Sequence, residues 1–167
     1  ERYAFFSKAI PSVLPLIGFI PTIIHANDWQ TALVPVYLKT IFHDEYYRNI
    51  RTVFTIHNIA YQGKYDPAIL GDVFGLGEQS RSILCYDGII NLMKGAIVCC
   101  DVLSTVSPTY AEEIKTPEYS HGLHYIIKQY AYKLKGVING IDTKFYDASS
   151  DESIFVKYDK NSVEGKI

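Results

Sequence analysis

The order of apolar and polar positions along the chain predicts helices that alternate with short, buried strands. Residues 2–18 carry apolar side chains three and four positions apart, which is the pattern of an amphipathic helix. The stripe expected to face the core consists of Phe6, Ala9, Ile10, Val13, Leu14 and Ile17. Pro11 and Pro15 fall inside this segment, so we expect a bend or a break there.

Short apolar runs rich in β-branched residues predict four strands, at residues 22–26, 51–56, 102–106 and 134–138. Between and after them, helical spacing predicts helices over residues 29–39, 89–99, 108–115 and 123–131. Asp28 is expected to cap the first of these helices. Ser107 and Pro108 are a typical helix start, with serine as the cap and proline at the first helical position.

Alternation of strand and helix indicates the α/β class. The strands are nearly continuous apolar runs, as in parallel sheets that are covered on both faces. We therefore predict a Rossmann-like, doubly wound parallel sheet in a single domain over residues 1–167. Residues 59–88 are expected to form an irregular loop, and the tail beyond about residue 147 is polar and poorly patterned. The only methionine is Met93, so we expect the chain to be a piece of a longer protein.

Composition excludes several classes of protein. The 16 Lys and Arg residues nearly balance the 18 Asp and Glu residues, which gives no electrostatic reason to bind nucleic acid or an anionic membrane. No apolar run approaches the ~20 residues that a membrane span needs. Cys85, Cys99 and Cys100 fit neither a disulfide framework nor a metal site, and free thiols suit a reducing cytosol. The chain has no GxGxxG, Walker A or GxSxG motif.

Polar and aromatic residues follow each predicted strand. Parallel α/β sheets bind ligands at the carboxyl ends of their strands, so these residues are expected on one rim. They are His25, Asn27, Asp28, Trp29, Gln30, His57, Asn58, Tyr61, Gln62, Gly63, Ser107, Pro108, Asn139, Gly140 and Asp142. Amides and carboxylates that bind hydroxyls in pairs, beside aromatic faces, favour a polyhydroxylated ligand such as a sugar.

The same residues also have purely structural interpretations. Asp28 can serve only as a helix cap, and Trp29 can belong to the core. His25 can be a buried, hydrogen-bonded histidine, and His57 can simply close a strand. Asn139 and the glycine after it can form an ordinary turn. From the residues alone, the sequence thus predicts an α/β ligand-binding domain with a polar and aromatic rim.

Four strings in the sequence together resemble one family. They are HANDWQTAL at residues 25–33, VFTIHNIAYQG at 53–63, TVSPTYAEEI at 105–114 and GVINGID at 136–142. Their order and spacing resemble those of bacterial glycogen synthases and plant starch synthases, from residue 1 to about residue 146. Asn27 and Gln30 stand where some members have histidine, and Thr22 stands where aspartate is common.

This resemblance implies a GT-B glycosyltransferase of two Rossmann-like domains, of which the chain forms part of the first. The implied reaction transfers glucose from ADP-glucose to the non-reducing end of an α-1,4-glucan such as glycogen, with retention and with no metal or other cofactor. The implied compartment is the cytoplasm. The alternative is a non-catalytic sugar- or nucleotide-binding α/β module. A transferase acting on sucrose or lipids fits the HNIAYQG string less well.

Specific roles follow from the resemblance, position by position. His57 matches the histidine beside the transferred glucose, and Asp28 with Trp29 matches a pair on the acceptor side. Asn58, Tyr61 and Gln62 match residues of the same wall. Asn139 matches an asparagine near the donor glucose.

The family's lysine- and glycine-rich loop and its basic second domain are not in this sequence. We therefore expect the chain alone to be inactive. Strands expected before residue 1 are missing as well, and we expect the exposed sheet edge to favour self-association.

Overall fold

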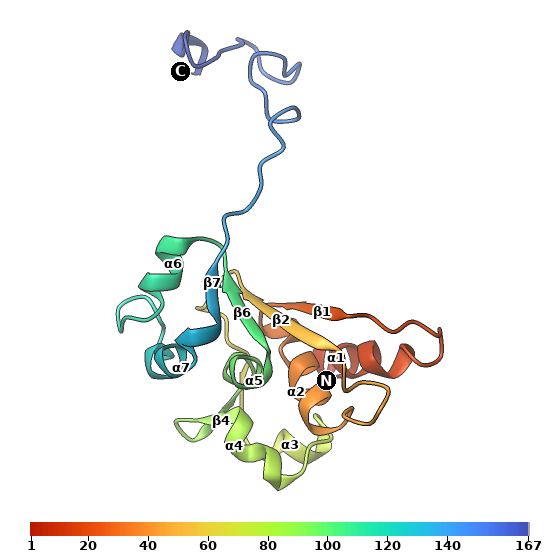
Figure 1. Cartoon of the computed structure of the whole chain (residues 1–167). Coiled ribbons are helices and arrows are strands. Elements are labelled where there is room, and N and C mark those ends of the chain that lie inside the picture. Colours follow the sequence, from red (N-terminus) through yellow and green to blue (C-terminus); the bar gives the residue numbers. More distant parts are fainter. Residues whose placement is uncertain (167) are drawn as a thin grey trace.

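The computed structural model describes residues 1–166 and has a four-stranded parallel sheet at its centre (Figure 1). Its strands lie in the order β1 (Ile23–Asn27), β2 (Arg51–Ile56), β6 (Val102–Thr105) and β7 (Leu134–Gly136). All three neighbouring pairs are parallel. The α/β class and the four predicted strands are therefore confirmed, each strand within one or two residues of its expected bounds.

The helices that join these strands all lie on one face of the sheet. The three connections between neighbouring strands contain, in order, α2 (Leu33–Thr40), α5 (Leu92–Cys99) and α7 (His124–Gln129). Because the strand order runs in one direction, right-handed crossovers place all three on the same side. The first helix, α1 (Arg2–Val13), packs beside α2 on that side. In residues 1–166, the helices named here therefore pack on one face of the sheet.

Strand β1 shows the consequence of this one-sided packing. Among residues 1–166 it pairs only with β2, so its other edge is free of partners in this part of the chain. Ala26 points into the core, whereas the side chains of Ile23, His25 and Asn27 alternate onto the open face and are exposed. His25 is hydrogen-bonded to the hydroxyl of Thr55 at 2.6 Å, but it is not the buried histidine that its apolar strand suggested.

Residues 59–88, expected to be irregular, contain most of a small antiparallel sheet. It consists of β3 (Lys64–Tyr65), β5 (Ile89–Asn91) and β4 (Cys85–Tyr86) in that order. Short helices α3 (Ile69–Asp72) and α4 (Arg81–Leu84) complete the region. The β4–β5 hairpin turns at Asp87 and Gly88, both with positive φ, as a type I′ turn requires.

Two helix starts are set by side-chain caps. The Asn91 carboxamide accepts a hydrogen bond from the Lys94 N–H at 3.0 Å, so α5 begins at Leu92 and not at residue 89. Helix α6 (Pro108–Glu113) begins as predicted, because the Ser107 hydroxyl accepts from the Tyr110 N–H at 2.9 Å.

The predicted buried stripe of α1 is correct only in part: Leu14 is buried and Ile10 packs against the core, but Phe6, Val13 and Ile17 are exposed. The helix buries its small residues Ala4 and Ser7, together with Pro11 and the following Leu14. The larger apolar side chains lie on the opposite side, towards solvent: Phe5, Phe6, Val13, Leu16 and Ile17. The buried side of α1 thus consists mainly of small residues where the helix contacts α2.

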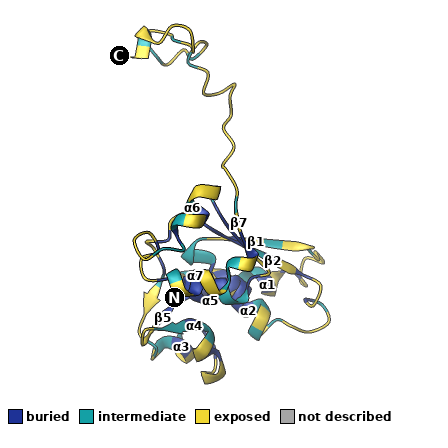
Figure 2. Cartoon of the chain, turned by 60° about the vertical axis from the view of Figure 1, so that its left-hand side comes forward, coloured by how far each residue is buried: buried dark blue, intermediate teal, exposed yellow. Residues whose placement is uncertain are grey.

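One continuous core lies between the sheet and its helices, as the buried residues of Figure 2 show. Cys99 and Cys100 belong to this region, and burial raises the pKa of both thiols to about 11. From about residue 137 the chain leaves this body as an exposed tail (Figures 1 and 2). Among residues 1–166, no helix is both long and apolar enough to span a membrane.

Candidate functional site

The carboxylate of Asp28 joins the ends of the two strands that carry most of the predicted site residues. Its Oδ1 accepts hydrogen bonds from the backbone N–H of His57 at 2.8 Å and of Asn58 at 3.3 Å. The side chain makes no capping bond to the short 3₁₀ turn that follows at Trp29–Thr31. The expectation that Asp28 caps a helix is therefore wrong, because its carboxylate serves the neighbouring strand.

Asp28 also has a strained backbone. Its φ of 54° and ψ of 179° lie in a region that is essentially reserved for glycine. The backbone N–H of Asp28 donates to the Thr55 carbonyl at 2.9 Å, which holds the residue at the sheet edge. Such strain costs about 1–3 kcal/mol and persists only where the surroundings hold it in place. It is a feature expected of a functional site.

The imidazole of His57 lies at the same rim. Its Nε2 is 2.9 Å from Oδ1 of Asn27, the last residue of β1. The side chain of the following Asn58 closes a local turn, because its Oδ1 accepts a hydrogen bond from the Ala60 N–H at 3.0 Å. These bonds order the segment directly after β2.

A cleft of about 290 Å³ opens beside this rim. Its walls are formed by the predicted site residues Asp28, Trp29, Asn58 and Tyr61, together with Gln30. Tyr61 is 65% exposed, so its ring is available to a ligand. Carboxylate, amide and aromatic groups facing one small cleft are suited to binding sugar hydroxyls and C–H surfaces. No lysine or arginine is among these lining residues.

Trp29 has both a structural and a site-facing side. Its ring packs edge-on against Tyr3, with centroids 5.0 Å apart, and lies 6.5 Å from the ring of Tyr65. Gly63 passes close beneath it with a φ of 66°, and a Cβ there would be 2.8 Å from the Trp29 ring. The half-buried indole is thus held rigidly at the wall of the cleft.

The structure does not place Gln62 on the wall of this cleft. Its side chain is only 3% exposed. The amide donates to the carbonyls of Ile59 and His121, at 3.0 and 3.1 Å, and accepts from the Asn91 amide at 2.7 Å. Gln62 therefore braces the loop that carries Tyr61, and its polar atoms are occupied by the protein.

Asn139 is separate from the other predicted residues. It lies three residues beyond β7, which is two strands away from β2, and it is exposed at the start of the tail. The structure thus brings together Asp28, Trp29, His57, Asn58 and Tyr61, but not Asn139. Asn27, expected on the rim but given no specific role, and Thr31, which the sequence analysis did not single out, both contact this group. Their position beside Asp28, in the HANDWQTAL string, was the available signal.

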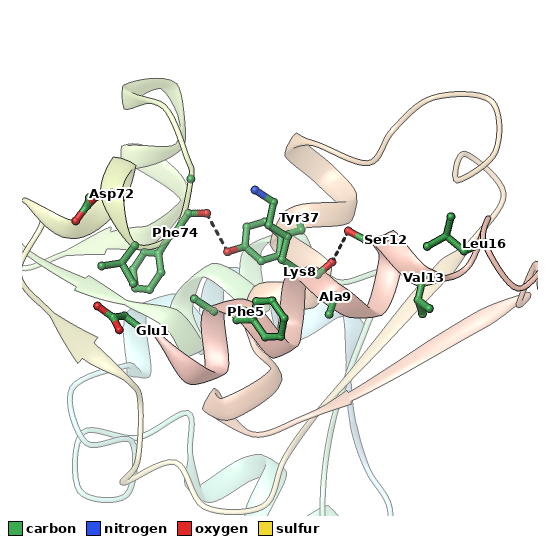
Figure 3. A pocket seen from close by; sticks show the side chains of 13 residues that line it. Glu1, Phe5, Lys8, Ala9, Ser12, Val13, Leu16, Tyr37, Asp72 and Phe74 are labelled. Atoms are coloured by element: carbon green, nitrogen blue, oxygen red, sulfur yellow. Dashed lines mark hydrogen bonds between the residues drawn. The ribbon is translucent and has the colours of Figure 1, made fainter.

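A larger cleft of about 670 Å³ lies elsewhere, between α1 and residues 72–75 (Figure 3). The Tyr37 hydroxyl, which donates to the Phe74 carbonyl at 2.9 Å, forms part of its wall. Apolar side chains such as Phe5 and Leu16 dominate the rest. It contains none of the predicted site residues. Among residues 1–166, no group of three or more His, Cys, Asp or Glu side chains is placed to hold a metal ion.

The parallel α/β sheet with a polar, aromatic rim at its strand ends is that of a GT-B glycosyltransferase N-terminal domain, as the match to a solved synthase given below shows. The profile of the family described as "Starch synthase catalytic domain" matches residues 1–129. The chain belongs to this family.

Curated relatives and a solved structure agree with this assignment. A glycogen synthase of Streptococcus agalactiae (strain NEM316) is 44% identical, over 100% of this chain and 36% of the relative. One from Clostridium botulinum (strain Alaska E43) is 42% identical, over 99% of this chain and 36% of the relative. The catalytic domain of starch synthase IV from Arabidopsis thaliana, bound to ADP and acarbose, has a TM-score of 0.84 and 33% identity, covering 99% of this chain and 34% of that chain. This chain thus spans about a third of the length of the relatives it matches.

Proposed function

We propose that this chain supplies the acceptor-side wall of a glucan synthase. The proposed reaction transfers glucose from ADP-glucose to the non-reducing end of an α-1,4-glucan, with retention. The observation that carries this proposal is the cleft at the ends of β1 and β2, where Asp28, Trp29, Asn58 and Tyr61 meet. Supporting it, the relatives are glycogen synthases, and the solved plant synthase holds ADP and acarbose, a ligand with many hydroxyl groups.

In this proposal the protein contributes positioning. His57 contacts the transferred glucose, while Asp28 and Trp29 hold the acceptor end of the glucan. Asn58 and Tyr61 bind its hydroxyls and ring faces, and Gln62 braces their loop. Asn139 is assigned to the donor side. Oriented hydrogen bonds of this kind lower the barrier by fixing the reacting groups before ADP leaves the anomeric carbon of the donor glucose.

The chain alone is expected to be inactive in glucose transfer. The departing diphosphate needs cationic stabilisation, and the described residues that line the cleft include no lysine or arginine. A hybrid in which residues 1–167 replace the matching segment of the Streptococcus agalactiae glycogen synthase is expected to be active. Incorporation of labelled glucose into glycogen measures both proteins. Transfer by the isolated chain at the rate of the intact synthase would contradict this expectation.

Glucan binding by the isolated chain tests the acceptor role directly. Titration with a maltooligosaccharide, followed by NMR amide shifts, is expected to give saturable changes at Asp28, Trp29, His57 and Asn58. ADP-glucose is expected to give little change. Tyr61→Ala should weaken glucan binding, whereas Tyr132→Ala, which removes another exposed ring, should not. A folded chain with no response to glucan, together with an inactive hybrid, would favour the non-catalytic module instead.

We also propose that the isolated chain associates with a second copy of itself. Strand β1 has a free edge, and exposed apolar side chains surround it, among them Leu16 and Ile23. Leu16 also lines the apolar cleft of Figure 3. Backbone pairing along β1 and burial of this surface both favour a dimer.

Light scattering coupled to size exclusion tests this association. We expect dimers or larger species for the unmodified chain and a shift to monomers for a Leu16→Lys/Ile23→Lys double variant. The matched control Val156→Lys, at an exposed apolar position in the tail, should leave the association unchanged. A monomer at every accessible concentration would refute the proposal.

A cytoplasmic location is proposed as well. Its support is the set of three free cysteines, which suits a reducing compartment, and the bacterial glycogen synthases among the relatives.

A further inference from the structure

The ring of His57 is held by Asn27, a residue with no role in the site described so far. The two side chains meet at the ends of neighbouring strands, with Nε2 of His57 2.9 Å from Oδ1 of Asn27. Asn27 pairs with Thr55 in the β1–β2 register, so His57 follows its partner position by two residues. The bond therefore crosses from the last residue of β1 to the segment just beyond β2.

The chemistry of the amide decides the direction of this bond. The Asn27 Nδ2 group donates to the His25 carbonyl at 3.5 Å, which turns Oδ1 towards His57. An amide oxygen can only accept, so the imidazole must donate its Nε2–H. In the neutral ring, Nδ1 is then left without a proton and acts as a hydrogen-bond acceptor.

Asn27 is itself fixed by a single hydroxyl. The Oγ1 of Thr31 accepts from the Asn27 N–H at 2.6 Å and donates to the Asn27 carbonyl at 2.7 Å. These two bonds close a turn that contains the strained Asp28. The carboxylate of Asp28 in turn accepts a hydrogen bond from the backbone N–H of His57. The backbone of His57 and its ring are thus held by two consecutive residues of one clamped turn.

We propose that Asn27 is a positioning residue, which fixes the orientation and the tautomer of His57 so that Nδ1 faces the sugar as an acceptor. Thr31 holds Asn27 in place. The sugar group that meets Nδ1 is then a hydroxyl acting as donor. This inference rests on the proposed transferase function for its consequence, but the geometry itself can be tested in the isolated chain.

NMR of the imidazole nitrogens tests the geometry. In the unmodified chain, we expect a visible Nε2–H signal of His57, which is exposed but hydrogen-bonded to Asn27 and therefore slowed in its exchange with water. Asn27→Leu has nearly the same shape but no acceptor, and it should lose this signal. Asn27→Asp keeps the acceptor oxygen and should retain it. Asn49→Leu, at an exposed asparagine in the loop before β2, is the matched control and should change nothing.

Thr31→Val serves as a second variant, because it removes the clamping hydroxyl without touching the amide. It should speed the exchange of the His57 Nε2–H with water. If Asn27→Leu does not fold, this variant alone tests whether Asn27 positions the ring of His57. Absence of the protected signal in the unmodified chain would overturn the proposal. Its persistence in a folded Asn27→Leu chain would do the same.

Activity of the hybrid synthase tests the consequence. Asn27→Leu is expected to lower kcat by about 10- to 100-fold, the range seen for misplaced catalytic groups, with the KM for glucan changed less than about twofold. Asn27→Asp should restore most of kcat. If the hybrid is inactive from the start, the transferase function fails while the NMR result still judges the role of Asn27. An unchanged kcat in Asn27→Leu would overturn the role itself.

Discussion

Glucose transfer by the hybrid synthase is expected to fall by about 100- to 1,000-fold when Asp28 is replaced by alanine. The Asp28 carboxylate is the acceptor for two backbone N–H groups, those of His57 and Asn58. Without it, both donors lose their partner and the turn that carries His57 can move. Since a displacement of about 1 Å can cost 100-fold in rate, the loss of transfer follows from geometry alone.

A comparison of two variants separates this role from stability. Asp28→Gly also removes the carboxylate, but glycine adopts the backbone angles of this position without strain. We expect Asp28→Gly to unfold at a higher urea concentration than Asp28→Ala, with a free energy of unfolding about 1–3 kcal/mol larger. Both variants should be equally poor in transfer. If Asp28→Ala transferred glucose at the wild-type rate, Asp28 would have no role in the site. If the two variants were equally stable, the backbone at this position would be unstrained.

Gly136→Ala is expected to destabilise the fold by about 3 kcal/mol. A Cβ at this position would lie closer than 3.0 Å to the carbonyl oxygen of Ser107 and to the backbone of Pro108. Backbone atoms cannot turn aside as a side chain can, so either β7 or the start of α6 must shift. Urea unfolding followed by circular dichroism measures this loss.

Gly140→Ala provides the matched control, in the same GVING string. No atom lies within 4 Å of the position that its Cβ would take. We expect a change in unfolding free energy of less than about 0.5 kcal/mol. If both alanine variants were equally stable, close packing would not be the reason for glycine at position 136.

The parallel sheet could be predicted because each strand is a distinct apolar run. The small antiparallel sheet was missed, although Asp87 and Gly88 are a strong hairpin signal. The flanking strands are only two and three residues long, and β5 continues directly into α5. A pattern search over longer windows therefore interprets Ile89–Asn91 as the start of the helix.

The face of α1 could not be predicted from its apolar residues. Hydrophobic spacing identifies a helix, but close contact between helices can favour small residues such as Ala4 and Ser7. The sequence also gave no sign that one face of the sheet stays open, since strand patterns do not say where each crossover packs.

The proximity of four candidate residues could be predicted from their positions in the sequence. The rule that ligands bind at strand ends brings Asp28, Trp29, Asn58 and Tyr61 together, and the structure does so. What each side chain bonds to could not be derived in this way. The carboxylate of Asp28 and the amide of Gln62 both have partners 29 or more residues away, which only the tertiary fold reveals.

The spacing of the strands along the chain has a consequence for the order of folding. The side chains of Thr55 in β2 and Ser104 in β6 are hydrogen-bonded and lie 49 residues apart in the sequence. The side chains of His25 in β1 and Thr55 in β2 are also hydrogen-bonded, and they lie 30 residues apart. Closing the longer loop costs more chain entropy, so β1–β2 pairing precedes the arrival of β6 when other factors are equal. The residues that line the candidate cleft come from the ends of β1 and β2. The rim that carries the candidate cleft can therefore assemble during folding before the sheet is complete.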